Sequence, residues 1–200
     1  MIIINHMENY ALVCETIRFI KEMFCDIFDG HDVDHSLRVY NNAMLIIESI
    51  PECDALCVSL AALLHDVDDH KLFETKNNYN ARYFLSSHHL EENYIDTICS
   101  TINAVSFSQN KGISPPTIEG KIVQDADRLD AIGAIGIART FTFSGAHGRG
   151  LEASVQHFYD KLFLLKESMN TEKAKEMATA RHIYMKNYLE QLQQETNGLY

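Results

Sequence analysis

The segment Ala61–Lys71, with the sequence AALLHDVDDHK, changes from an apolar run to a dense polar cluster within one residue. Its polar part contains three carboxylates, two imidazoles and one ammonium group. An imidazole nitrogen and a carboxylate oxygen form a ligand pair that suits divalent ions such as Mn, Fe, Co, Ni or Zn. The adjacent His65 and Asp66 can both reach one ion only at the end of a buried helix, where both side chains turn inward. The alternative interpretation is a polar helix terminus with a surface histidine.

Two other apolar segments carry polar residues of the same types. His35 lies in a predicted helix that begins near His31, and Asp127 lies in a second polar cluster, Asp125–Asp130, which follows apolar residues at helical spacing. Three separate helices are therefore expected to supply His35, the His65–Asp66 pair and Asp127.

The predicted helix that carries His35 also has a polar face. The residues that share this face are His31, His35, Arg38 and Asn42, which recur at helical spacing. For His31 we expect simple solvation. The pairing of His35 with Arg38 one turn later is more informative, because one side chain could bind a metal while the other meets an anion.

Helical periodicity runs through nearly the whole chain. The expected helices cover residues 7–28, 31–50, 55–64, 78–87, 91–107, 118 into the second polar cluster, 152–166 and 171–195. Asp54 and Thr171 are expected to cap the third and the last of these helices. Strand-like alternation is nearly absent, and the chain has only three prolines. The expected fold class is all-α.

The apolar residues also predict which face of each helix is buried. The helix 55–64 is apolar all round, which is typical of a central, buried helix. Small residues in the segment Ala131–Arg139 predict very close helix packing. The expected buried stripes are Val33, Leu37, Tyr40, Met44 and Ile47 in the helix 31–50, and Met177, Arg181, Tyr184, Tyr188 and Leu192 in the helix 171–195.

The composition indicates a globular protein that does not bind nucleic acid non-specifically. The chain has 200 residues, of which 46% are hydrophobic and 22% charged, so it can bury the core of one domain. Its formal net charge of −11 repels polyanions at long range. A small phosphate substrate remains compatible with this charge, provided that metals and nearby Lys or Arg residues reverse the local field.

The five cysteines, 14, 25, 53, 57 and 99, are odd in number and form no CxxC pair. We expect reduced core thiols and a cytoplasmic protein. No apolar run approaches the length of a membrane span, and the first residues lack the features of a signal peptide. The glycine-rich segment Ser144–Gly150, which contains Arg149, is expected to be a mobile surface loop rather than a phosphate cradle.

Three of these segments together resemble the H…HD…D signature of the HD-domain metal-dependent phosphohydrolases. They are DVDHSLRV at 32–39, ALLHD at 62–66 and QDADRL at 124–129. The resemblance covers about residues 20–140. The run 66–71, the run 125–139 and the helices beyond residue 150 further resemble small bacterial HD proteins that cleave nucleoside triphosphates to monophosphate and pyrophosphate. This implies one HD domain over residues 1–200, an all-α bundle with a metal-binding core at about 20–140 and C-terminal helices at about 151–195.

The resemblance implies that His35, His65, Asp66 and Asp127 are the four protein ligands of one divalent ion, which could be Mn, Mg, Fe, Co, Ni or Zn. Asp125 is the alternative fourth ligand. Two residues apart on a helix point about 200° away from each other, so the two carboxylates cannot both serve. The Ala–Asp pair of the family favours Asp127.

The resemblance also implies roles for residues near the ligands. Asp69 takes the position of an acidic residue in several HD hydrolases, and we expect it to orient or deprotonate a water molecule. Asp68 is expected to orient a ligating imidazole. The residues expected to hold phosphate oxygens are Lys71, Arg38 and Arg128, with Arg149 on a closing loop. A structural salt bridge is the alternative for each of these cations.

Two His and two Asp leave coordination positions open for water and substrate, whereas a structural site is closed and prefers Cys. The expected function is therefore a metal-dependent phosphohydrolase acting on small nucleotides, with pyrophosphate release from triphosphates. The alternatives are a phosphomonoesterase acting on nucleoside monophosphates and a non-catalytic, nucleotide-binding regulatory HD domain. The expected partner is a small nucleotide, and the chain is also compatible with a homodimer. Neither a membrane nor a stable nucleic-acid complex is expected.

Overall fold

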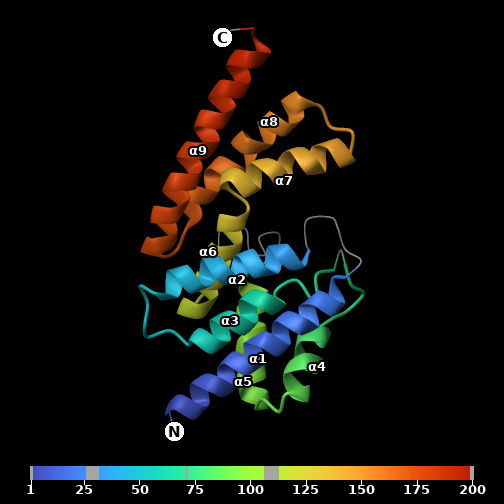
Figure 1. The fold of residues 1–200 in the computed structure, drawn as a ribbon, viewed down its shortest axis with the longest axis vertical. Helices are drawn as coiled ribbons and strands as arrows, with labels where there is room; N and C mark the ends of the chain where they lie inside the picture. Colours follow the sequence, from blue (N-terminus) through green and yellow to red (C-terminus); the bar gives the residue numbers. More distant parts are fainter. Residues whose placement is uncertain (1, 26–31, 71, 106–112, 199–200) are drawn as a thin grey trace. The chain divides into compact units, whose positions relative to one another are not determined.

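The computed structural model describes residues 2–25, 32–70, 72–105 and 113–198 (Figure 1). These residues form nine α-helices and one 3-10 helix, with no strand among them. The expected all-α class is confirmed. None of the helices in these ranges is long and apolar enough to cross a membrane.

The helices divide into two compact units, Met1–Asp127 and Arg128–Tyr200. The first unit contains α1 (Ile2–Met23), α2 (Val33–Ile47), α3 (Ala55–Leu64), α4 (Tyr79–Ser87), α5 (Glu92–Val105) and most of α6 (Ile118–Asp130). The second contains α7 (Gly133–Ala146), α8 (Leu151–Asp160), η1 (Leu162–Ser168) and α9 (Glu172–Thr196). The expectation that all 200 residues form a single domain stays a prediction.

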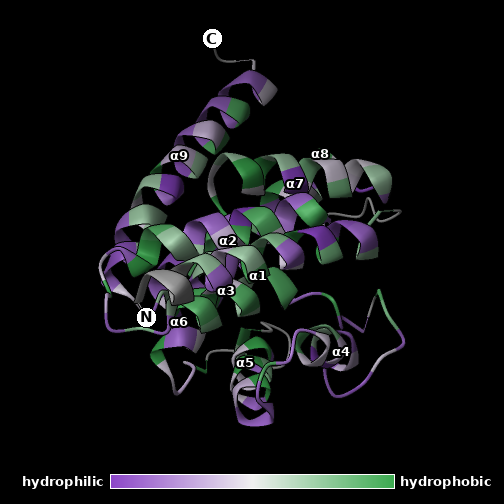
Figure 2. Cartoon of the chain, turned by 60° about the horizontal axis from the view of Figure 1, so that its bottom comes forward, coloured by the Kyte–Doolittle hydropathy of each residue, from purple (hydrophilic) through white to green (hydrophobic). Residues whose placement is uncertain are grey.

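The centre of the first unit is α3, which packs against α1, α2 and α5. Its residues from Cys57 to Leu64 are all buried, and its ribbon is largely hydrophobic in Figure 2. The carboxylate of Asp54 caps the helix by accepting from the backbone N–H groups of Leu56 and Cys57, at 3.1 and 3.0 Å. The expected cap and the expected bounds of this helix are confirmed. Because α3 ends at Leu64, the next two residues, a histidine and an aspartate, emerge from the core.

The expected buried stripe of α2 is wrong. The residues that α2 buries are His35, Ser36, Val39, Asn42, Ala43 and Ile46, whereas the five residues of the expected stripe are only partly buried. Small side chains on the buried face let α3 approach closely. Of the buried polar side chains, His35 meets His65 and Asn42 bonds the carbonyl of Ala126, whereas the Ser36 hydroxyl has no hydrogen-bond partner among the described residues. The polar face of α2 is therefore buried at His35 and Asn42, and His31, for which solvation was expected, lies outside the described residues.

The helix α4 is capped by a residue from a distant turn. Asn78 precedes α4 in a left-handed conformation, with φ of 55°, and its side chain makes no cap hydrogen bond. The carboxylate of Asp68 instead accepts from the first-turn N–H groups of Asn80 and Ala81, both at 3.0 Å. Thr75 donates to the same carboxylate at 2.6 Å. Asp68 thus ties the turn after α3 to the N-terminus of α4.

In the second unit, α7 packs against α8 and α9, and η1 packs against α8 and α9. Gly133 has φ of +78°, and a Cβ atom there would lie 3.0 Å from the Cβ and Cγ atoms of Arg181. The close packing expected from the small residues of this segment is therefore present at Gly133. The expected helix 152–166 is interrupted after Asp160, because Lys161 leaves the helical region with φ of −138°, and the chain continues as a 3-10 helix.

The helix α9 begins as expected, with the Thr171 hydroxyl accepting from the N–H group of Ala174 at 3.4 Å. Its expected stripe is wrong, because the buried residues are Ala174, Ala178, Met185 and Leu189. The glycine-rich segment 144–150 is also less loop-like than expected. Residues up to Ala146 belong to α7, and α8 starts at Leu151.

All five cysteines are free thiols, but they are not all in the core. Cys57 and Cys99 are buried, and burial raises the pKa of their thiols to about 12 and about 11. Both therefore stay protonated at neutral pH. Cys14 and Cys53 are partly buried and Cys25 is exposed, so the expectation of core thiols is wrong for Cys25.

Candidate metal centre

The C-terminus of α3 positions His65 and Asp66. The imidazole of His65 donates from Nδ1 to the carbonyl oxygen of Ala62, one turn earlier, at 2.8 Å. A proton on Nδ1 leaves the lone pair of the neutral ring on Nε2, where a metal ligand needs it. The end of the helix thus fixes both the orientation and the tautomer of this imidazole.

The second imidazole comes from the start of α2. The carboxylate of Asp32 caps this helix by accepting from the N–H group of His35 at 2.9 Å. The Nε2 atoms of His35 and His65 lie 3.2 Å apart, and the two rings meet edge to face. Two helices that are distant in sequence therefore direct their imidazole nitrogens at the same point.

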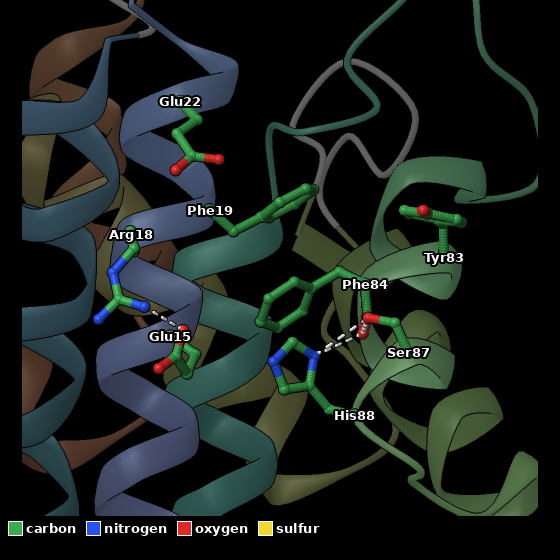
Figure 3. A pocket seen from close by; sticks show the side chains of 8 residues that line it. All are labelled: Glu15, Arg18, Phe19, Glu22, Tyr83, Phe84, Ser87 and His88. Atoms are coloured by element: carbon green, nitrogen blue, oxygen red, sulfur yellow. Dashed lines mark hydrogen bonds and ion pairs between the residues drawn. The ribbon is translucent and has the colours of Figure 1, made fainter.

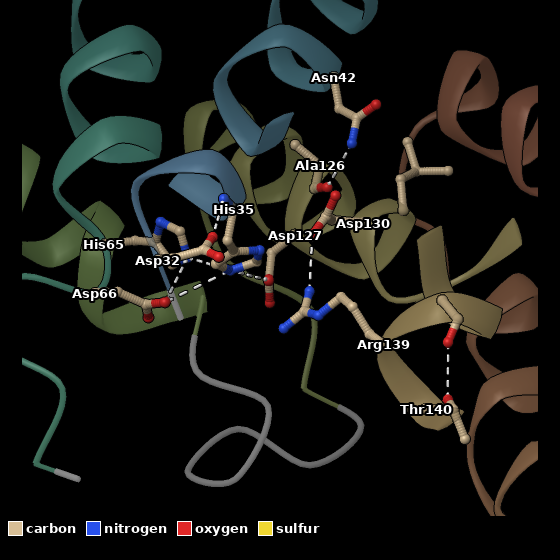
Figure 4. Close-up of polar contacts among 12 residues, drawn as sticks. Asp32, His35, Asn42, His65, Asp66, Ala126, Asp127, Asp130, Arg139 and Thr140 are labelled. Carbon is tan, nitrogen blue, oxygen red and sulfur yellow. Dashed lines mark hydrogen bonds and ion pairs between the residues drawn. The ribbon is translucent and has the colours of Figure 1, made fainter. Parts of the chain in front are cut away.

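Two carboxylates complete the cluster (Figure 4). The Oδ2 atom of Asp66 lies 3.5 Å from Nε2 of His35 and 3.4 Å from Nε2 of His65. The Oδ1 atom of Asp127, from α6, lies 3.5 Å from Nε2 of His35. His35, His65 and Asp127 offer ligand atoms that all lie within 4.8 Å of one another. Figure 4 shows Asp66 and Asp127 on two sides of the imidazole pair.

The spacing of the His35, His65 and Asp127 atoms fits a single divalent ion, and Asp66 lies beside both imidazoles. Metal bonds of about 2.1 Å that diverge by about 90° to 109° place neighbouring ligand atoms about 3.0 to 3.4 Å apart. The pairs His35–His65, His35–Asp66, His65–Asp66 and His35–Asp127 are separated by 3.2 to 3.5 Å. Imidazole nitrogens and carboxylate oxygens are also the ligand types that such ions accept. The group could therefore hold a divalent metal.

The cluster is open on the side of Asp127. The side chains of His35 and His65 are 3% and 4% exposed, and that of Asp66 is 10% exposed. The side chain of Asp127, by contrast, is 28% exposed. Water or a substrate oxygen can thus approach from the α6 side, as a catalytic rather than a closed structural site requires.

Asp69 and Asp68 have different surroundings. Asp69 lies in the turn that follows Asp66, its N–H group bonds the Asp66 carbonyl at 3.0 Å, and its carboxylate is 19% exposed. Its expected catalytic role stays a prediction. The expectation that Asp68 orients a ligating imidazole is wrong. The Ala62 carbonyl performs that role for His65, and the carboxylate of Asp68 is used in capping α4.

The expected phosphate-binding cations are distributed over the chain. Arg38 is partly buried on α2, one turn after His35, whereas Lys71 lies outside the described residues, as does His31. Arg128 is buried in the second unit, where its guanidinium donates to the carbonyl of Ser168. Arg149 lies in the same unit, with its guanidinium 5.0 Å from the ring centre of Phe143. Each expected phosphate contact stays a prediction, but Arg128 and Arg149 also have structural partners.

Several polar residues near these elements were not expected to have structural roles. In the second unit, Asp130 forms an ion pair with Arg139 at 2.7 Å, and Arg181 donates to the carbonyl of Leu129 at 2.6 Å. Burial lowers the pKa of Arg181, although the charge of Asp130 opposes this shift. The signal in the sequence was weak, because these partners lie 9 and 52 residues apart.

In the first unit, the buried amide of Asn42 donates to the carbonyl of Ala126 at 3.2 Å. The sequence showed that Asn42 and His35 share a polar face, but it did not show that the partner of Asn42 is the Ala126 carbonyl.

A surface pocket elsewhere in the first unit is not the candidate site. It lies between α1 and α4, around the stacked rings of Phe19 and Phe84 (Figure 3). Arg18 on its rim pairs with Glu15, and the His88 imidazole bonds the Phe84 carbonyl. Its polar groups are thus engaged with one another, and no metal-ligand cluster of the described residues lies in it.

Comparison with known proteins identifies the family. The family model for the HD domain matches residues 32–132. The chain is 39% identical over 197 residues to the Bacillus subtilis protein YpgQ, with 92% of this chain and 94% of YpgQ covered.

Solved structures agree with this relationship. The crystal structure of YpgQ in complex with ADP matches with a TM-score of 0.81 at 34% identity, and 94% of this chain and 96% of that chain are covered. The structure of an HD-superfamily hydrolase from Bacillus thuringiensis gives a TM-score of 0.79 at 38% identity, with 94% and 98% covered. The matched HD model includes all four residues of the metal cluster. The chain therefore belongs to the HD-domain superfamily of metal-dependent phosphohydrolases.

Proposed function

We propose that this phosphohydrolase acts on small nucleotides and cleaves (deoxy)nucleoside triphosphates to the nucleoside monophosphate and pyrophosphate. The observation that carries the proposal is the convergence of four ligand atoms from three helices, with partial exposure at Asp127. The ADP in the YpgQ structure supports a nucleotide as the ligand of a close structural relative.

In this proposal His35, His65, Asp66 and Asp127 hold one divalent ion. A bound ion supplies positive charge to phosphoryl oxygens and lowers the pKa of a water molecule. The imidazole of His65 keeps the lone pair of its Nε2 atom directed inward, since its Nδ1 proton is committed to the Ala62 carbonyl. The identity of the ion is left open among Mn, Mg, Fe, Co, Ni and Zn, because imidazole and carboxylate ligands accept all of them.

The residues around the cluster position the reactants. Asp69 orients and deprotonates the attacking water, because it follows the ligand pair by one turn and its carboxylate is partly exposed. Arg38 and Lys71 hold phosphate oxygens, and Arg128 and Arg149 contribute to the hold on the β- and γ-phosphates. Attack of water at the α-phosphate then releases pyrophosphate. A monophosphate should be a poor substrate, because it lacks the β- and γ-phosphates that these cations bind.

An isotope experiment tests the position of bond cleavage. Hydrolysis of triphosphates in ¹⁸O-labelled water should place the label in the nucleoside monophosphate, and monophosphates should turn over more slowly. The same panel of nucleotides should be run with separate detection of orthophosphate and pyrophosphate. Label found only in orthophosphate, or faster turnover of monophosphates, would identify a phosphomonoesterase instead. Nucleotide binding without any turnover would identify a regulatory HD domain.

A further inference from the structure

We propose that Asn42 is a positioning residue of the metal centre, and that its amide sets the rotation of α6 so that Asp127 faces His35. The inference rests on the proposed metal centre. The amide nitrogen of Asn42 donates to the carbonyl oxygen of Ala126 at 3.2 Å, and both residues are buried (Figure 4). Ala126 is the residue directly before Asp127.

The bond joins the two helices that bring together a pair of ligands. Asn42 follows His35 by seven residues, which is two turns, so both side chains leave the same face of α2. The ligand pair itself meets at 3.5 Å between Nε2 of His35 and Oδ1 of Asp127. These two helices are therefore connected at two adjacent residues of α6, once through a side chain and once through a carbonyl.

The rotation of α6 matters because the helix carries more than one carboxylate. Asp125 and Asp127 point about 200° apart around the helix axis. Asp125 is fully buried, whereas Asp127 is partly exposed beside the imidazoles. A hydrogen bond to a backbone carbonyl is sensitive to this rotation, since the carbonyl moves with the helix. The Asn42 bond thus selects which carboxylate reaches the centre.

The carbonyl of Ala126 does not need Asn42 for its own satisfaction. A helical carbonyl has two lone pairs and already accepts an N–H group from the next turn of its helix. Asn42, in contrast, carries a buried amide that needs an acceptor. The bond therefore holds α2 and α6 in place, and it is not needed to satisfy the backbone of α6.

Gln124 provides a matched control on the same helix. Its buried amide donates to the carbonyls of Ala104 and Ile113, at 3.1 and 3.3 Å. Ala104 belongs to α5, which brings no ligand to the cluster. Replacing Gln124 by leucine thus removes buried amide bonds from α6 without touching the connection to α2.

The test measures binding of Co²⁺ alone to chelator-treated protein, by calorimetry and by the visible absorption of the bound ion. Asn42→Leu and Asn42→Ala should each weaken Co²⁺ binding about tenfold or more and change the absorption spectrum, as loss of a residue that orients a ligand does. Gln124→Leu should lower the melting temperature of the metal-free protein to a similar extent, with wild-type Co²⁺ affinity and spectrum.

Co²⁺ binding like that of the wild type in either Asn42 variant would overturn the proposal, as would an equal loss in Gln124→Leu. Wild-type protein that binds no Co²⁺ would overturn both this inference and the proposed function. If wild-type protein binds Co²⁺ but hydrolyses no nucleotide, only the proposed function fails, and the affinities of the variants still decide the role of Asn42.

Discussion

Short-range contacts hold the segment of each histidine of the metal cluster, and the variants of these residues give the most direct tests. Asp32 fixes the start of the helix that carries His35, and the Ala62 carbonyl fixes the ring of His65. Neither contact uses an Nε2 atom, the atom that each imidazole directs at the cluster. The loss of one ligand should therefore act on metal binding rather than on the fold around it.

The first prediction concerns His65. In His65→Ala, bound metal and phosphohydrolase activity should disappear together, because one of the four ligand atoms is missing. Metal content by mass spectrometry and steady-state turnover check this. His88→Ala is the matched control, since the Nδ1 atom of His88 bonds the carbonyl of Phe84 at 2.9 Å at the end of α4, away from the cluster. Full activity in metal-free His65→Ala protein would contradict the assignment.

The second prediction separates Asp69 from its neighbour. Asp69→Asn should reduce kcat by about a hundredfold or more, because an amide cannot accept the proton of the attacking water. Metal content and melting temperature should stay near those of the wild type. A loss of metal would make Asp69 a ligand or a support of one, and unchanged turnover would remove it from the mechanism.

At the scale of the helices, side chains that are distant in sequence cap a helix and pack against its start. Asn78 makes no cap hydrogen bond to α4 because its side chain bonds Asn103, and Asp68 caps the helix from the turn after α3. In the second unit, Gly133 lets Arg181 lie against the start of α7. Both features make predictions about stability.

The third prediction concerns the cap of α4. Asp68→Ala should lower the free energy of unfolding by about 1–2 kcal/mol, the usual effect of losing a charged cap. Thr75→Val should cost less, because it removes only one of the three donors to the Asp68 carboxylate. Urea titrations followed by circular dichroism measure both. A fall in kcat per folded Asp68→Ala molecule that exceeds that of Asp69→Asn would reverse the assigned roles.

The fourth prediction concerns the packing of α7 against α9. Gly133→Ala should destabilise the protein by about 1–3 kcal/mol through overpacking against Arg181, in addition to the strain of a positive φ. Gly148→Ala is the control, because Gly148 also has a positive φ, of +63°, but its added Cβ atom would meet open space. Thermal unfolding of both variants isolates the contribution of the contact. Equal losses would mean that the Arg181 contact is unimportant.

At the scale of the whole molecule, stability should depend on metal, because the four ligands come from parts of the chain up to 92 residues apart. A ligand that binds only the folded state at a hundred times its Kd stabilises that state by about 2.7 kcal/mol. The melting temperature should therefore rise on addition of metal and fall with a chelator.

The variant Asp127→Ala should show little of this metal-dependent rise. A full rise in that variant would place the ion elsewhere in the chain. The single domain over 200 residues, the homodimer and the cytoplasmic location stay predictions at this scale.

Local signals in the sequence were enough to predict the all-α class, the family and the set of ligand candidates. The Asp54 cap and the bounds of α3 follow from hydrogen bonds and periodicity within about one turn of helix. The ligand candidates His35, His65, Asp66 and Asp127 could be recognised in the sequence because they are polar residues within apolar segments.

The rotation of the helices and the pairing of their polar groups, in contrast, depend on tertiary packing. The buried faces of α2 and α9 differ from the expected stripes, since packing against neighbouring helices outweighs the local distribution of apolar residues. The partners of Asp68, Arg128 and Asn42 lie 7 to 84 residues away along the chain. A hydrogen bond across such a distance leaves no periodic trace in the sequence, because its geometry exists only once the helices have packed.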